Sequence, residues 1–83
     1  MSTPTLTLYS RPGCHLCDEA RAALERVRAT APFALREVNI ESDVSLHKRY
    51  LERIPVVVLG DEELFDFFVD ETALEAKLYR LPG

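Results

Sequence analysis

One apolar run in the second half of the chain does most to limit how this sequence can fold. Residues 54–59 read IPVVVL, a continuous apolar stretch rich in β-branched valine, which is typical of a strand covered on both faces. A strand buried in this way needs packing layers on both sides of its sheet. The chain has 83 residues, and because domains usually hold about 100–200 residues, all elements must share one core. We therefore expect a single α/β domain over residues 1–83.

Strand and helix patterns alternate around this run. Residues 5–10 alternate polar and apolar side chains, and apolar residues recur at helical spacing over 15–29. The expected elements, in chain order, are a strand over 5–10, a helix over 15–29, a strand over 33–40, a short helix capped by Ser42 or Asp43, strands over 54–59 and 64–69, and a last helix capped by Asp70. That last helix places Leu74, Leu78 and Leu81 on one face.

The order of these elements, β-α-β-α-β-β-α, also predicts how the strands pair. Strands 5–10 and 33–40 are separated by a helix, so a right-handed crossover should make them parallel. Strands 54–59 and 64–69 are joined by the short turn at 60–62 and should be antiparallel. The predicted architecture is a four-stranded mixed sheet flanked by helices.

Charge and hydropathy exclude several classes of partner. Ten basic and fourteen acidic residues give a net charge of −4, whereas nucleic-acid binders usually carry a basic patch or stripe. The longest strongly apolar run is far shorter than the roughly 20 residues that cross a bilayer, and the first residues lack the pattern of a secretory signal. We expect a monomeric cytoplasmic protein without a nucleic-acid or membrane partner.

The two cysteines, Cys14 and Cys17, are better explained by chemistry than by stabilisation. A disulfide between them closes only a four-residue ring, which would constrain the unfolded chain very little. We place Cys14 at the first helical position after Pro12 and Gly13, where backbone N–H groups and the helix dipole stabilise a thiolate. Such positions lower a cysteine pKa from about 8.5 to roughly 3.5–7. Cys17, one turn further on, can then resolve the mixed disulfide that Cys14 forms.

Neighbouring charges suggest tuning and binding roles. A protonated His15 beside the nucleophile would favour the thiolate, and Arg11 would add positive potential on the other side. Arg11 and Arg53 either clamp a substrate carboxylate or are simply solvated charges. We expect no metal site, since zinc usually takes four ligands, but a metal or iron–sulfur binding module and a non-catalytic interaction protein stay open as alternatives. Exposure of the aromatic residues Phe65, Phe67 and Phe68 would favour a protein partner.

The sequence resembles the glutaredoxin branch of the thioredoxin fold, and within it a small, poorly characterised glutaredoxin-like subfamily. The resemblance rests on LTLYSRPGCHLC at 6–17, on RIPV at 53–56 and on the element order across nearly the whole chain. It implies that Pro55 is cis and faces the cysteines, and that the Ile54 backbone pairs with an extended substrate or with glutathione. It also implies that Asp70 contacts the γ-glutamyl amine.

Three departures from the family pattern bear on the substrate. His-Leu replaces Pro-Tyr between the cysteines, and Arg53-Ile54-Pro55 replaces Thr-Val-Pro. Phe67 and Phe68 stand where the family has two glycines, which admit the glutathione backbone because they lack side chains. Glutathione therefore stays an open co-substrate, and we expect no bound cofactor.

Together these features predict a dithiol–disulfide oxidoreductase that acts through Cys14 and Cys17. It would reduce or exchange disulfides of proteins or small molecules, and an upstream thiol reductant or reductase would restore the dithiol.

Overall fold

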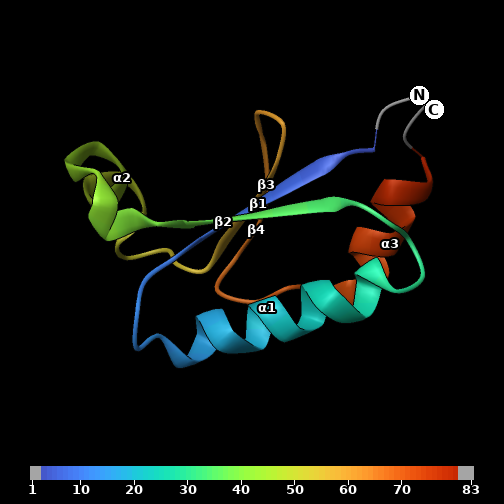
Figure 1. Ribbon diagram of the computed structural model, residues 1–83, viewed down its shortest axis with the longest axis horizontal. Helices are drawn as coiled ribbons and strands as arrows, with labels where there is room; N and C mark the ends of the chain where they lie inside the picture. Colours follow the sequence, from blue (N-terminus) through green and yellow to red (C-terminus); the bar gives the residue numbers. More distant parts are fainter. Residues whose placement is uncertain (1–2, 81–83) are drawn as a thin grey trace.

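Four strands form one mixed sheet in the computed structural model, which describes residues 3–80 (Figure 1). The elements are β1 (Thr5–Ser10), α1 (His15–Arg28), β2 (Ala34–Asn39), the 3-10 helix η1 (Ile40–Ser42), α2 (Val44–Tyr50), β3 (Val56–Leu59), β4 (Glu62–Asp66) and α3 (Glu71–Tyr79). The strand order is β2-β1-β3-β4, with β1 and β2 parallel and the other neighbours antiparallel. The predicted element order and strand pairing are confirmed.

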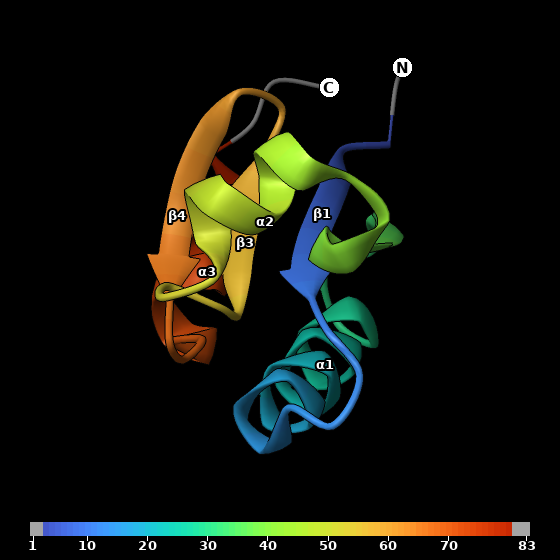
Figure 2. The same ribbon diagram turned by 90° about the vertical axis from the view of Figure 1, so that its left-hand side faces the viewer.

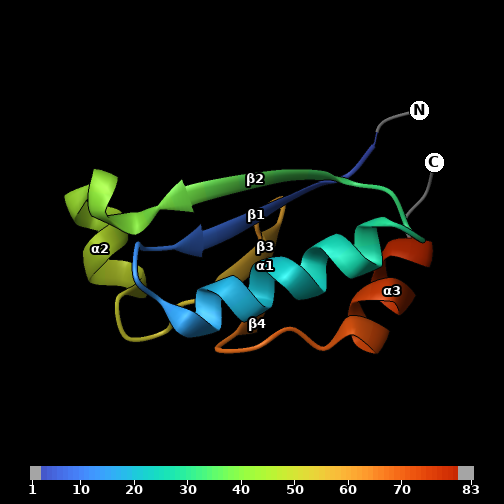
Figure 3. The same ribbon diagram turned by 60° about the horizontal axis from the view of Figure 1, so that its bottom comes forward.

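The strand β3 is buried on both faces, as its valine run predicts. Val57 packs with Leu6 and Leu8 in a core beneath α1 and α3, whereas Val56 and Val58 belong to a second cluster on the opposite face. Figure 2 shows α1 on one side of the strands, and Figure 3 shows α2 at the end of the sheet where β1 and β2 terminate. The second cluster therefore lies at the end of β1 that leads into α1.

Several predicted boundaries are wrong by a few residues. The turn after β3 holds only Gly60 and Asp61, with Gly60 at φ +61°, so β4 spans Glu62–Asp66 rather than 64–69. A two-residue turn lets strand pairing resume at once, and β4 ends where Phe67 adopts φ +68°. The strand predicted over 33–40 is trimmed to Ala34–Asn39 by the unpredicted helix η1, and that over 54–59 begins at Val56.

One of the apolar residues that recur at helical spacing over 15–29 is not buried, since Leu16 has 44 % of its surface exposed. Leu81 lies outside the described residues. Within residues 3–80, no helix has the length and apolar character needed to cross a membrane.

Candidate functional site

The two cysteines are joined by a disulfide at the start of α1. Their Cα atoms are 5.2 Å apart, inside the range of about 4.4–6.8 Å that a disulfide allows. Cys17 is almost fully buried, with 1 % of its surface exposed, whereas Cys14 is only half-buried. The pair therefore presents one accessible sulfur and one shielded sulfur, which is the asymmetry that the sequence predicts.

Cys14 is the N-cap of α1 and not its first helical residue, which corrects the predicted position by one residue. Its backbone is extended, and its Sγ atom accepts a hydrogen bond from the Cys17 N–H at 3.2 Å. The loop before it turns at Gly13, where φ is +77°, a conformation that glycine adopts without steric cost. The physical reason for the prediction is unchanged, because an N-cap side chain lies directly over the free N–H groups of the first turn.

The peptide bond between Ile54 and Pro55 is cis, as the resemblance implies. Ile54 belongs to the same apolar cluster as Cys17 and Cys14, so this bond lies on the side of the molecule that holds the cysteines. The Ile54 N–H, however, already donates to the Tyr50 carbonyl at 3.0 Å. A substrate backbone that pairs with Ile54 would therefore have to use its carbonyl oxygen or displace this internal bond.

The Arg53 side chain is held by acidic residues of β4. It forms an ion pair with Glu63, and its Nε atom lies 3.6 Å from a carboxylate oxygen of Asp66. Its guanidinium also lies over the Tyr50 ring, 5.7 Å from the centroid, and Tyr50 stacks on Tyr9 with 4.5 Å between centroids. Hydrogen bonding to Arg53 lowers the pKa of Glu63. Arg53 is thus already neutralised where the sequence suggested a clamp for a substrate carboxylate.

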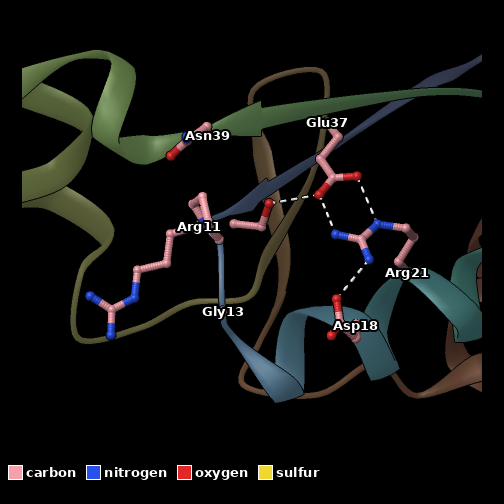
Figure 4. A pocket seen from close by; sticks show the side chains of 8 residues that line it. Arg11, Gly13, Asp18, Arg21, Glu37 and Asn39 are labelled. Atoms are coloured by element: carbon pink, nitrogen blue, oxygen red, sulfur yellow. Dashed lines mark hydrogen bonds and ion pairs between the residues drawn. The ribbon is translucent and has the colours of Figure 1, made fainter.

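The side chains of both candidate tuning residues are exposed to solvent. His15 is exposed, and its Nε2 atom lies 2.9 Å from a carboxylate oxygen of Glu19, one turn further along α1. Arg11 is also exposed, and Figure 4 shows its side chain projecting away from Glu37 and Arg21. Any influence of either residue on Cys14 would act through space across solvent, where charges are strongly screened.

Asp70 is the N-cap of α3, as predicted. Its Oδ1 atom accepts a hydrogen bond from the Ala73 N–H at 3.0 Å. One carboxylate oxygen is thereby committed to the helix, and the exposed remainder of the side chain is the part that a substrate could reach.

A polar network beside the cysteine loop was not anticipated from the sequence. The Ser10 hydroxyl donates to Glu37 at 2.8 Å, and Arg21 Nε donates to the other carboxylate oxygen at 2.8 Å. Arg21 also donates to Asp18 at 2.8 Å (Figure 4). These four residues line an open hollow of about 370 Å³ together with the loop from Arg11 to Gly13. Hydrogen bonding to Arg21 lowers the pKa of Glu37.

The only signal for this network in the sequence is the spacing of Asp18 and Arg21, which suits a helical ion pair. Glu37 is 27 residues from Ser10 along the chain, and only the parallel pairing of β1 with β2 brings the two together. Among the described residues, no three His, Cys, Asp or Glu side chains are grouped so as to hold a metal ion.

Comparison with known proteins assigns the chain to a family. Residues 5–79 match the family described as Glutaredoxin-like domain (DUF836). The chain belongs to this glutaredoxin-like family. The match includes both cysteines, the cis-proline and Asp70, and the expected glutaredoxin-like resemblance is confirmed.

Solved structures support the same fold. Protein Ne2328 from Nitrosomonas europaea is 33 % identical, covers 93 % of each chain and has a TM-score of 0.81. The X-ray structure of protein XcR50 from X. campestris is 41 % identical, covers 93 % of this chain and 99 % of its own, and has a TM-score of 0.75. Oxidised mitochondrial thioredoxin 3 from Saccharomyces cerevisiae is 17 % identical and covers 98 % of this chain and 81 % of its own, with a TM-score of 0.69. The glutaredoxin-like chain therefore has an α/β thioredoxin-like fold, as predicted.

Proposed function

We propose that this glutaredoxin-like protein is a thiol–disulfide oxidoreductase that uses Cys14 as the attacking and Cys17 as the resolving cysteine. The single observation that supports this most strongly is the disulfide at the N-terminus of α1, with one half-buried and one buried sulfur. Its family and fold support a redox role for this pair. The proposed reaction takes place between these two sulfurs and a substrate disulfide.

The reaction proceeds in two exchange steps from the reduced protein. The Cys14 thiolate attacks one sulfur of a substrate disulfide, forming a mixed disulfide and releasing the other substrate sulfur as a thiolate. The Cys17 thiolate then attacks Cys14 Sγ, which forms the intramolecular disulfide and releases the second substrate thiolate. Two electrons pass to the substrate, whose two thiolates take up protons, and the protein dithiol becomes a disulfide. A thiol reductant or reductase must then return two electrons and two protons.

The site geometry suits each step. The free N–H groups of the first turn of α1 stabilise negative charge on Cys14, so the thiolate that attacks is favoured. Because Cys17 lies one turn further along the chain than the N-cap Cys14, the two Cα atoms are 5.2 Å apart, a separation that a disulfide spans. In a reducing compartment such as the cytoplasm, thiol systems keep such a pair largely reduced between turnovers.

The test is disulfide reduction with dithiothreitol as electron donor and insulin or bis(2-hydroxyethyl) disulfide as substrate. We expect the wild-type protein to accelerate the reaction, and Cys14→Ser to reduce it to the rate of the buffer. Serine is the suitable substitution because it is also a good N-cap, so α1 should stay folded, as circular dichroism would verify. Undiminished activity of Cys14→Ser, or no activity of the wild type, would contradict the proposal.

A further inference from the structure

Three exposed apolar side chains lie on one surface beside α1. Leu16, Phe67 and Phe68 have 44 %, 48 % and 70 % of their surfaces exposed, respectively. They line a hollow of about 150 Å³ between α1 and the segment that joins β4 to α3, and Figure 3 shows this segment running alongside α1. We call this surface the apolar groove; its apolar lining residues are Leu16, Ala20, Ala23, Phe67, Phe68 and Val69.

One wall of the groove is the segment that joins β4 to α3, which is strained at Phe67 and held by backbone hydrogen bonds. Phe67 has φ +68°, a conformation that costs energy for any residue with a side chain but not for glycine. Its N–H donates to the Pro55 carbonyl at 2.9 Å, and the Phe68 N–H donates to the Asp66 carbonyl at 2.8 Å. A phenylalanine kept in this conformation while half of its surface stays in water points to a role outside folding, since strain persists mainly where function requires it.

The groove adjoins the proposed redox site from two directions. Leu16 lies between Cys14 and Cys17 in the sequence, so one wall of the groove begins in the active-site turn. On the other wall, the hydrogen bond from Phe67 reaches Pro55, whose neighbour Ile54 belongs to the same apolar cluster as the cysteines. A chain whose cysteine reacts with Cys14 would therefore place a neighbouring side chain directly over the groove.

The charges around the groove indicate what kind of chain fits. Glu19 and Glu71 line it beside a single cation, Arg26, which donates to both carboxylate oxygens of Glu71. Arg26 offsets Glu71, so the negative charge of the rim comes from Glu19, whose carboxylate also lies 2.9 Å from His15 Nε2. With His15 neutral, this charge favours a basic partner and disfavours an anionic one. Glutathione carries two carboxylates and one ammonium group, so it is a net anion. Arg53, the cation next to the cis-proline, is already paired with Glu63.

We propose that the apolar groove docks an extended segment of a protein substrate in which an apolar and a basic side chain flank the reacting cysteine. This inference rests on the proposed function and specifies its substrate class as protein disulfides rather than glutathione. Two features act against glutathione binding here. Arg53 is already paired with Glu63, and Phe67 and Phe68 are bulky where the family has glycines. Burial of an apolar side chain against Phe68 supplies the affinity, and Glu19, the rim carboxylate that is not paired with Arg26, selects the basic neighbour.

The test compares three disulfides as substrates of the wild-type protein. They are a disulfide-linked peptide with Leu and Lys flanking its cysteine, the matched peptide with Ser and Glu, and oxidised glutathione; bis(2-hydroxyethyl) disulfide reports the basal activity. We expect the Leu/Lys peptide to be preferred. Phe68→Ala should raise its KM roughly five- to thirty-fold, the range for losing an aromatic anchor, and leave reduction of bis(2-hydroxyethyl) disulfide unchanged.

The matched control is Tyr79→Ala, which removes an aromatic side chain of similar exposure (66 %) from the end of α3. Tyr79→Ala should change neither the KM for the Leu/Lys peptide nor the rate of reduction of bis(2-hydroxyethyl) disulfide. If Phe68→Ala unfolds, Phe68→Gln keeps a side chain of intermediate size and should give the same loss for the Leu/Lys peptide. Equal KM values for the three substrates, or equal effects of Phe68→Ala and Tyr79→Ala, would overturn the inference while leaving the proposed function intact.

Two other results would overturn the inference for different reasons. A wild-type protein that reduces none of the four disulfides would remove the proposed function and the inference together. A concentration-dependent dimer in sedimentation equilibrium that Phe68→Ala dissociates would assign the groove to a second copy of this chain.

Discussion

Cys14 has a structural and a proposed chemical task at the same position. Its Sγ atom closes the disulfide and also accepts the Cys17 N–H as the cap of α1. In the reduced protein a thiolate at this position would accept the same hydrogen bond with the added strength of a charged acceptor. The group that caps the helix is then the group whose charge the helix stabilises.

The difference in burial between the two sulfurs leads to a prediction about the reaction intermediate. In Cys17→Ala, Cys14 should attack a substrate disulfide and stop there, because the resolving sulfur is missing. Alanine keeps this buried, apolar position apolar, so the protein should fold. Intact-protein mass spectrometry should show one substrate thiol added per chain, and dithiothreitol should remove it.

The matched variant is Cys14→Ala, in which only the buried Cys17 sulfur remains. It should form the adduct far more slowly, because Cys17 has 1 % of its surface exposed. Faster adduct formation by Cys14→Ala than by Cys17→Ala would show that the two roles are reversed.

The cysteine pair and the cis-proline could be predicted because each is marked by local sequence. The breaker at Pro12 and Gly13 positions Cys14 over a helix terminus, whereas the cis bond before Pro55 is implied by the family resemblance that RIPV at 53–56 supports. The partners of Arg53 could not be predicted. They lie on β4, and the pairing of β3 with β4 contains a register shift between Val57 and Val58 that nothing in the sequence marks.

At the scale of elements, helix ends were predicted better than strand ends. Asp43 and Asp70 cap α2 and α3. A carboxylate directly before a helix accepts hydrogen bonds from the free N–H groups of its first turn, so the local sequence marks both positions. The end of β4 was misplaced because the sequence from Leu64 to Val69 keeps a strand-like apolar content, and nothing in it marks Phe67 as a left-handed residue. Sequence rules are expected to fail at strained sites, and this one borders the apolar groove.

The cap at Asp70 allows its structural and binding roles to be separated. Asp70→Ala removes the acceptor for the Ala73 N–H and should lower the free energy of unfolding by about 1 kcal/mol. Asp70→Ser keeps a capping oxygen and should retain nearly all of this stability. Urea denaturation followed by circular dichroism at 222 nm would measure both variants.

The matched control for this prediction is Asp43→Ala, which removes the equivalent cap of α2, where Asp43 accepts from the N–H groups of Ser45 and Leu46. Its loss of stability should be similar. If Asp70→Ser keeps its stability but has a raised KM for a disulfide substrate, then the carboxylate also contacts substrate. Full stability of Asp70→Ala would contradict the capping role.

At the scale of the whole molecule, α1 is fastened to its neighbours by ion pairs as well as by the core. Arg21 joins it to Glu37 on β2, and Glu37 in turn accepts from Ser10 on β1. Further along, Arg26 joins α1 to Glu71 at the start of α3. The first of these links holds the helix near the end that carries the cysteines, so the position of the disulfide relative to the sheet depends on it.

This link should make stability depend on pH in acid. Hydrogen bonds from Arg21 hold the pKa of Glu37 below its ordinary value of 4.5, so the folded protein binds this proton less tightly than the unfolded chain. The contribution is fully present above about pH 4.5 and is lost as the pH falls through the lowered folded pKa. Because the Glu37 side chain is 36 % exposed, solvent screening keeps it to roughly 1 kcal/mol or less.

Glu37→Gln should remove this part of the acid sensitivity. The variant should be less stable than the wild type at neutral pH by up to about 1 kcal/mol, and the difference should shrink towards zero as the pH falls below about 4.5 and through the lowered pKa of Glu37 in the folded wild type. Urea midpoints measured across this range would show it, with the exposed Glu52→Gln as the control that follows the wild type throughout. Stability curves for Glu37→Gln and wild type that stay parallel into acid would mean that the Arg21–Glu37 ion pair does not stabilise the fold.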